Sequence, residues 1–222
     1  GSASDLGDTI NGYSGADEIK FAAANLTILD TVNGGTASDT LQIFSAAATL
    51  ADVDFTNVTN MEALTFVSIA SSDTDLGAEY SESGMATITL AASTNDLNLD
   101  SVTTAQTLNL VAGTDTVDAS SMTAALTVNI DSNDITNADT ITAGTGTSDI
   151  LEIDYDSSAT ASTALANVTG FETIKFADGD AANSLTTVDG NVASTKSLTI
   201  DASINVTTVS TIDISAETDG GI

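Results

Sequence analysis

Two aspartates and a pair of glycines in one short stretch have the residue types and spacing of a cation-binding turn. The stretch DTVNGGTASDTLQI runs from Asp30 to Ile43, and Asp30 and Asp39 stand nine residues apart. Glycine lets the backbone turn sharply and direct carbonyl oxygens inward, and each aspartate supplies a hard anionic oxygen. Calcium binds six to eight such oxygens at about 2.3–2.6 Å. The chemistry that these residues favour is therefore the binding of calcium, with Gly34 in the turn.

The same pattern occurs once before this stretch, in the segment from Asp8 to Phe21. Asp8 and Asp17 are also nine residues apart, and the interval from Asp8 to Asp30 equals the interval from Asp17 to Asp39. A repeat of this length suits one turn of a β-solenoid, in which strands of neighbouring coils lie about 4.8 Å apart. We therefore expect Asp8 to stack on Asp30 and Asp17 on Asp39. Because carboxylates at that distance repel each other, we also expect a cation between them.

A third copy lies between Asp139 and Asp149, with one more residue in its turn. All three copies are close to the nonapeptide G-G-x-G-x-D-x-U-x of calcium-binding parallel β-rolls, in which U is apolar. Tyr13 and Ala37 stand where that unit has glycine, and the glycines of the third copy are displaced. These departures predict a few sites at particular turns. The expected calcium ligands are Asp8, Asp17, Asp30, Gly34, Asp39, Asp115, Asp139, Asp149, Asp178 and Asp180.

Two separate motifs recur at one common offset, which indicates an internal duplication. The first motif is the Gly/Asp turn, which contains Asp39 in one copy and Asp149 in the other. The second motif is VTNMEALTF, which begins at Val58, and its copy is VTGFETIKF, which begins at Val168. The number of residues between the two copies is the same for both motifs. Each segment carries a glutamate at an expected strand entry. These two residues, Glu62 and Glu172, either cap backbone N–H groups or bind a metal ion.

Short runs in which apolar residues alternate with Thr, Asn or Asp predict half-buried strands. They are Thr87–Leu90, Asp96–Leu99, Thr107–Leu110, Leu126–Ile130, Ser197–Ile200 and Ser210–Ile214. We predict an all-β chain that forms a parallel β-solenoid, with one elongated domain over 1–222 and repeats over about 7–110 and 115–222. Asp115–Asp118 is interpreted as a degenerate turn, and helical turns are expected only at Ala46–Ala51 and Ala159–Ala166.

The charge of the chain is strongly negative. Among its 222 residues, 32 are Asp or Glu and 3 are Lys or Arg, which gives a formal net charge of −29. Such a surface excludes nucleic acid and argues against an anionic membrane, since both require basic residues. Bound cations would relieve the self-repulsion, whereas adaptation to salt is the alternative explanation of the acidity. Cysteine is absent, which excludes disulfides and is typical of many secreted bacterial proteins.

The ends and the hydropathy of the chain carry less information. We find no signal peptide and no apolar run of membrane-spanning length. The final residues, Asp219–Ile222, resemble the start of another Gly-Gly turn. We therefore expect the sequence to be a piece of a longer or processed polypeptide.

Residue types argue against catalysis. The chain has no His and no Trp, its only basic residues are Lys20, Lys175 and Lys196, and 4% of its residues are aromatic. Lyase chemistry on acidic sugars usually needs a basic side chain, and a Ser/His/Asp set or zinc cluster is lacking. Two carboxylates would suffice for a glycosidase, but platforms for sugar stacking are scarce. We expect that the protein is not an enzyme.

The Gly/Asp turns followed by Val-Thr-x-x-Glu resemble the repeat-in-toxin-related S-layer and surface proteins of Gram-negative bacteria, which are exported by type I secretion. The resemblance covers residues 7–66 and 138–176 best. It implies a right-handed β-solenoid, calcium at the Gly/Asp turns, an extracellular location at the cell surface, and assembly into a lattice.

The open ends of a solenoid expose unpaired strand edges, which favour pairing with another copy. Our first hypothesis is therefore a structural, self-assembling surface protein that forms an S-layer lattice or an extracellular filament. The alternative is a segment of a calcium-dependent adhesin that binds a receptor or a cell-surface polysaccharide. Ordered assembly of the isolated protein with calcium favours the first hypothesis, and a monomer that binds glycan favours the second.

Overall fold

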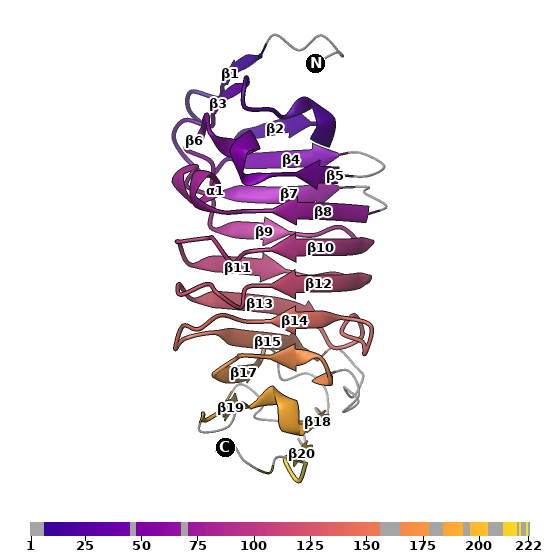
Figure 1. Ribbon diagram of the computed structural model, residues 1–222. Helices are drawn as coiled ribbons and strands as arrows, with labels where there is room; N and C mark the ends of the chain where they lie inside the picture. The colour runs from indigo at the N-terminus through magenta and orange to yellow at the C-terminus, as the bar shows by residue number, and fades with distance from the viewer. Residues whose placement is uncertain are drawn as a thin grey trace.

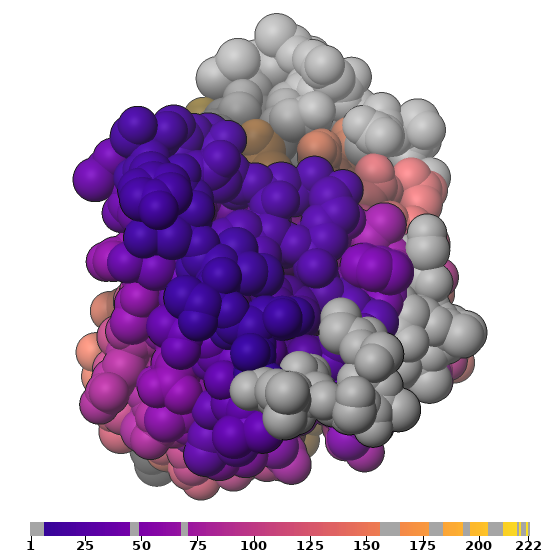
Figure 2. Space-filling view, turned by 90° about the horizontal axis from the view of Figure 1, so that it is seen from above, coloured from indigo at the N-terminus to yellow at the C-terminus, as the bar shows by residue number. Residues whose placement is uncertain are grey.

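The computed structural model describes residues 7–44, 48–67, 71–155, 165–177, 184–192, 196–203, 211–216, 218 and 221. In this part the chain consists mainly of short strands that stack coil upon coil in a column (Figure 1). The paired strands run parallel to each other. Figure 2, seen from the N-terminal end, shows the first coils in front of the later ones. The molecule is a β-solenoid, which confirms the predicted all-β parallel architecture.

Two long sheets form walls of the column. The nine-stranded sheet contains, in spatial order, β2 (Glu18–Phe21), β4 (Thr40–Phe44), β7 (Ala63–Val67), β9 (Thr87–Thr89), β11 (Gln106–Asn109), β13 (Leu126–Asp131), β15 (Ile150–Asp154), β17 (Thr173–Phe176) and β19 (Thr199–Asp201). The six-stranded sheet contains β5 (Ala48–Leu50), β8 (Ser71–Asp75), β10 (Thr94–Asn98), β12 (Thr114–Asp118), β14 (Thr140–Thr142) and β16 (Val168–Thr169). Two short sheets consist of β1 (Thr9–Asn11), β3 (Thr31–Asn33) and β6 (Val58–Thr59), and of β18 (Ser184–Thr186) and β20 (Thr211–Asp213).

The register of the nine-stranded sheet gives the length of each coil. Glu18 pairs with Thr40, and this is the spacing that the sequence predicted for the first coil from its aspartates. The coil from β9 to β11 is shorter, because Thr87 pairs with Thr107, and the coil from β17 to β19 is longer, because Thr173 pairs with Thr199. Because the side chains of a strand alternate between its faces, this register places like residues in columns along the solenoid.

Apolar side chains from every coil fill the interior. One column of the nine-stranded sheet contains the buried residues Ile19, Leu41, Leu64, Ile88, Leu108, Val128, Leu151 and Ile174. Burial of one such side chain stabilises the fold by about 1.5–3 kcal/mol. Two edge-to-face aromatic pairs add to this core, Phe55 with Tyr80 and Tyr155 with Phe176.

Helix is scarce in the described residues. There is one short α-helix, α1 (Ala78–Glu82), and there are three 3-10 turns, at Ala23–Asn25, Asp52–Phe55 and Asp189–Asn191. No helix in this part of the chain is long and apolar enough to cross a membrane.

Two local predictions are wrong. The expected helical turn at Ala46–Ala51 contains β5, because pairing with β8 outweighs the helix propensity of alanine. The expected turn at Asp115–Asp118 is part of β12, in which Asp115 and Val117 are buried. Most of the other predicted helical segment, Ala159–Ala166, lies outside the described residues.

Candidate cation-binding turns

The four aspartates of the first two Gly/Asp turns lie in two stacked pairs, as their common spacing predicted. The pairing of β1 with β3 places Asp8 beside Asp30, and the pairing of β2 with β4 places Asp17 beside Asp39. Asp30 and Asp39 are buried, whereas Asp8 is exposed. Stacking therefore brings carboxylates of successive coils into the same two corners of the solenoid.

The buried carboxylates accept hydrogen bonds from the preceding coil. Asp30 Oδ1 accepts one from the backbone N–H of Asp8, and Asp39 Oδ1 accepts one from that of Asp17, both at 2.8 Å. Asp30 Oδ2 accepts two more from Thr27, from its N–H at 2.7 Å and from its hydroxyl at 3.0 Å. Because both oxygens of Asp30 have donors, the stacking of Asp8 on Asp30 does not require a cation.

The two glutamates of the duplicated motif cap backbone amides. Glu62 Oε2 accepts a hydrogen bond from the N–H of Asp39 at 2.6 Å, and Glu172 Oε2 accepts one from the N–H of Asp149 at 3.0 Å. Asp149 Oδ1 in turn accepts a hydrogen bond from the N–H of Leu126 at 2.8 Å. The sequence left two roles open for these glutamates, capping of backbone N–H groups and binding of a metal ion. The contacts in the structure are those of the capping role.

A second buried column contains Asp115 and Asp139. Asp139 Oδ1 accepts a hydrogen bond from the N–H of Asp115 at 2.8 Å, and Asp139 Oδ2 accepts two from Thr136, at 2.7 Å and 3.1 Å. The contacts of Thr136 repeat those that Thr27 makes with Asp30, so the duplication extends to individual hydrogen bonds. Asp115 Oδ1 accepts a hydrogen bond from Asn95 Nδ2 at 2.6 Å. Burial nevertheless raises the pKa of Asp115 to about 6.

Carboxylate oxygens without a donor occur at the Gly/Asp turns. Asp17 Oδ2 and Asp39 Oδ2 are buried and form no hydrogen bond within the described part of the chain. Each lies against a glycine. A Cβ on Gly12 would meet Asp17 Oδ2 at 2.6 Å and Gly34 O at 2.2 Å, and a Cβ on Gly34 would meet Asp39 Oδ2 at 2.7 Å. Glycine is therefore required here because a side chain would collide with these oxygens.

These oxygens are the part of the structure that fits calcium. An unpaired carboxylate oxygen beside a main-chain carbonyl is a hard donor set, although it supplies only some of the six to eight oxygens that calcium takes. Among the described residues, no three acidic side chains converge on one point in a way that could hold a metal ion. The remaining ligands would therefore be carbonyl oxygens and water. The predicted ligands Asp178 and Asp180 lie outside the described residues.

Sequence reasoning missed the role of Asp52. Its carboxylate accepts hydrogen bonds from the N–H groups of Gly77, Glu79 and Tyr80 at 2.8–3.1 Å, and so caps the start of α1 from the preceding coil. No local pattern marks this contact, because donor and acceptor are at least 25 residues apart. The pattern Thr-x-x-Asp does not mark the contacts of Thr27 and Thr136 either, because it also occurs at Thr36, whose hydroxyl donates to the carbonyl oxygen of Tyr13.

The fold and these turns define the chain as a β-solenoid whose corners contain buried carboxylates bonded to backbone amides. No family model, no curated protein and no solved structure matches this chain.

Proposed function

We propose that this chain is a non-catalytic structural protein of the bacterial cell surface, related to the repeat-in-toxin and S-layer proteins, that assembles with copies of itself. The observation that carries the proposal is the nine-stranded sheet, in which one parallel strand pairing repeats from coil to coil. An end strand presents unpaired N–H and C=O groups that can pair with another chain. A stack of this kind can continue from copy to copy into a lattice or a filament.

Calcium has a specific place in this proposal. Asp17, Asp39 and Gly34 would contribute oxygens to a bound ion, and Asp149 would do so in the second repeat, because its Oδ2 is also buried without a hydrogen bond. Bound calcium would supply positive charge at these corners. With a net charge of −29, the chain needs such charge before copies can approach closely.

Titration of metal-stripped protein with calcium tests the proposal. We expect far-UV circular dichroism to show a gain of β structure and light scattering to show assembly, with both reversed by a chelator. The Asp39→Asn variant should need more calcium than the Asp96→Asn variant, whose substitution lies on the exposed face of β10. A protein that stays monomeric at every calcium concentration contradicts the proposal. If that monomer binds polysaccharide, the alternative function as an adhesin segment is supported.

A further inference from the structure

The outer face of the nine-stranded sheet carries two columns of small polar side chains. The register places nine residues in each column, and we call the two columns together the threonine face. The first column is Glu18, Thr40, Ala63, Thr87, Thr107, Thr127, Ile150, Thr173 and Thr199, and the second is Lys20, Gln42, Thr65, Thr89, Asn109, Asn129, Glu152, Lys175 and Asp201. All of these residues are partly or fully exposed.

This face is nearly neutral in a chain of net charge −29. Two of the three basic residues of the chain, Lys20 and Lys175, lie on it, and the four central strands β7, β9, β11 and β13 present no charge in either column. The outer face of the six-stranded sheet is different. Its outward positions include Asp73, Asp75, Asp96 and Asp118 and no basic residue. The two columns of the nine-stranded sheet therefore carry charges of both signs, whereas the outward charges of the six-stranded sheet are all negative. Asp131 and Asp154, at the ends of β13 and β15, add negative charge beside the columns.

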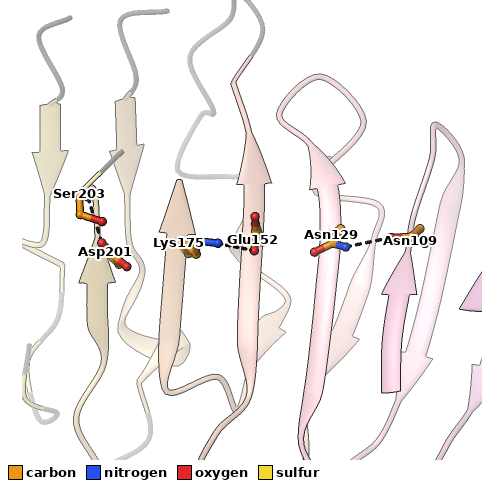
Figure 3. A network of polar contacts seen from close by, with 6 residues as sticks. All are labelled: Asn109, Asn129, Glu152, Lys175, Asp201 and Ser203. Carbon is orange, nitrogen blue, oxygen red and sulfur yellow. Dashed lines mark hydrogen bonds and ion pairs between the residues drawn. The ribbon is translucent and has the colours of Figure 1, made fainter. Parts of the chain in front are cut away.

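Hydrogen bonds and an ion pair link neighbouring side chains of the second column. Asn129 Nδ2 donates to Asn109 Oδ1 at 2.9 Å, and Asn109 Nδ2 donates to Thr89 Oγ1 at 3.2 Å. Further along, Lys175 Nζ lies 2.9 Å from Glu152 Oε2 (Figure 3). In the first column the hydroxyl of Thr107 has no hydrogen bond to another described residue. The face therefore offers fixed amides beside hydroxyl groups that can bond to an incoming surface.

We propose that the threonine face binds the threonine face of a second copy of this chain. The proposal rests on the self-assembly proposed above, for which it supplies a contact surface. β11 is the middle strand of the sheet. A two-fold axis parallel to β11 brings each strand opposite the strand that lies equally far from β11 on the other side, as in isologous dimers. Lys20 then lies opposite Asp201 of the second copy, and Thr107 lies opposite its own counterpart. No like charges face each other across the two columns in this arrangement.

The area of the face suits such a contact. Nine strands at about 4.8 Å spacing and about 15 Å of strand length give roughly 600 Å² per copy, somewhat below the ~800 Å² per partner of standard interfaces. An interface of this size supports a specific but weak dimer. Such a contact suits an assembly in which every copy makes several contacts.

Single cysteines test the contact, because these 222 residues contain no cysteine. We expect Thr107→Cys to form a covalent dimer on mild oxidation, since the two sulfurs lie close to the two-fold axis. Thr116→Cys is the matched control, because Thr116 lies on β12, in the same coil but on the opposite, acidic sheet. Equal dimer formation by both variants overturns the proposal.

Sedimentation velocity of Thr107→Asp and Thr116→Asp gives the second test, at high salt to screen the net charge. Thr107→Asp places two carboxylates against each other, so we expect its dissociation constant to rise by about 100-fold, while Thr116→Asp stays close to the wild type. If calcium drives assembly and Thr107→Asp assembles as readily as the control, the proposed function stands and this interface is wrong. A wild-type dimer that never assembles further supports the interface and contradicts the proposed function.

Discussion

Replacement of Asp115 by asparagine should raise stability at neutral pH, and the gain should disappear in acid. Asp115 lies in the interior with 1% of its surface exposed and accepts a hydrogen bond from Asn95. Burial raises its pKa from 3.8 to about 6, and the nearby Asp139 and Asp134 also act to raise it. An asparagine at this position keeps an oxygen for Asn95 and removes the buried charge.

The size of the effect follows from the shift in pKa. Between about pH 4 and pH 6, the folded protein holds a proton on Asp115 that the unfolded chain has lost, so stability falls as the pH rises. A shift from 3.8 to about 6 corresponds to at most about 3 kcal/mol at 1.36 kcal/mol per pH unit. We therefore expect Asp115→Asn to exceed the wild type by up to about 3 kcal/mol at pH 7 and to equal it near pH 4.

Urea unfolding from pH 4 to pH 8, in the presence of a chelator, measures this difference. Asp96→Asn is the control, since it removes one negative charge from the exposed face of the neighbouring strand. The control accounts for the general effect of net charge and should change the pH dependence little. The reasoning is refuted if Asp115→Asn is less stable than the wild type at pH 7, or if its pH dependence matches that of the control.

Three other substitutions test the corners of the solenoid by urea unfolding. Gly34→Ala places a Cβ 2.1 Å from the carbonyl oxygen of the next coil and should cost about 1–3 kcal/mol or more, whereas Gly190→Ala meets nothing within 4 Å and should cost far less. Asp52→Ala removes the acceptor of three amides at α1 and should cost about 2 kcal/mol, against about 1 kcal/mol or less for Asp54→Ala, which loses one amide contact. Glu62→Ala leaves the buried amide of Asp39 without an acceptor and should cost about 1–3 kcal/mol, while Glu62→Gln keeps an acceptor and should cost less. Equal losses from the two Glu62 variants would show that its charge, and not its hydrogen bond, is needed.

The sequence was sufficient to predict how the coils stack. The spacing of Asp8 and Asp30, repeated by Asp17 and Asp39, predicted their neighbouring positions, and alternation predicted strands such as β9 and β13. Both signals are periodic and local, and each follows from the geometry of a strand. The common offset between the two copies of the duplicated motif likewise predicted that Glu62 and Glu172 would have matching environments.

Long-range hydrogen bonding explains what the sequence did not reveal. Asp115 was interpreted as a turn residue because Asp115–Asp118 resembles a degenerate Gly/Asp turn, yet a hydrogen bond from Asn95 of the preceding coil makes the position acceptable inside a strand. The stacked aspartates were predicted to repel each other, but one oxygen of Asp30 and one oxygen of Asp39 each accept an N–H donor from the adjacent coil. In a solenoid the partner of a buried polar group is one coil away, and one sequence does not identify it.

Electron microscopy of the purified chain with calcium, with magnesium and with a chelator tests the proposed self-assembly most directly. We predict ordered sheets or filaments with calcium, a marked reduction with magnesium, and dispersed particles with the chelator. Dispersed particles under all three conditions, at concentrations where the protein is fully folded, would contradict a structural role based on self-assembly.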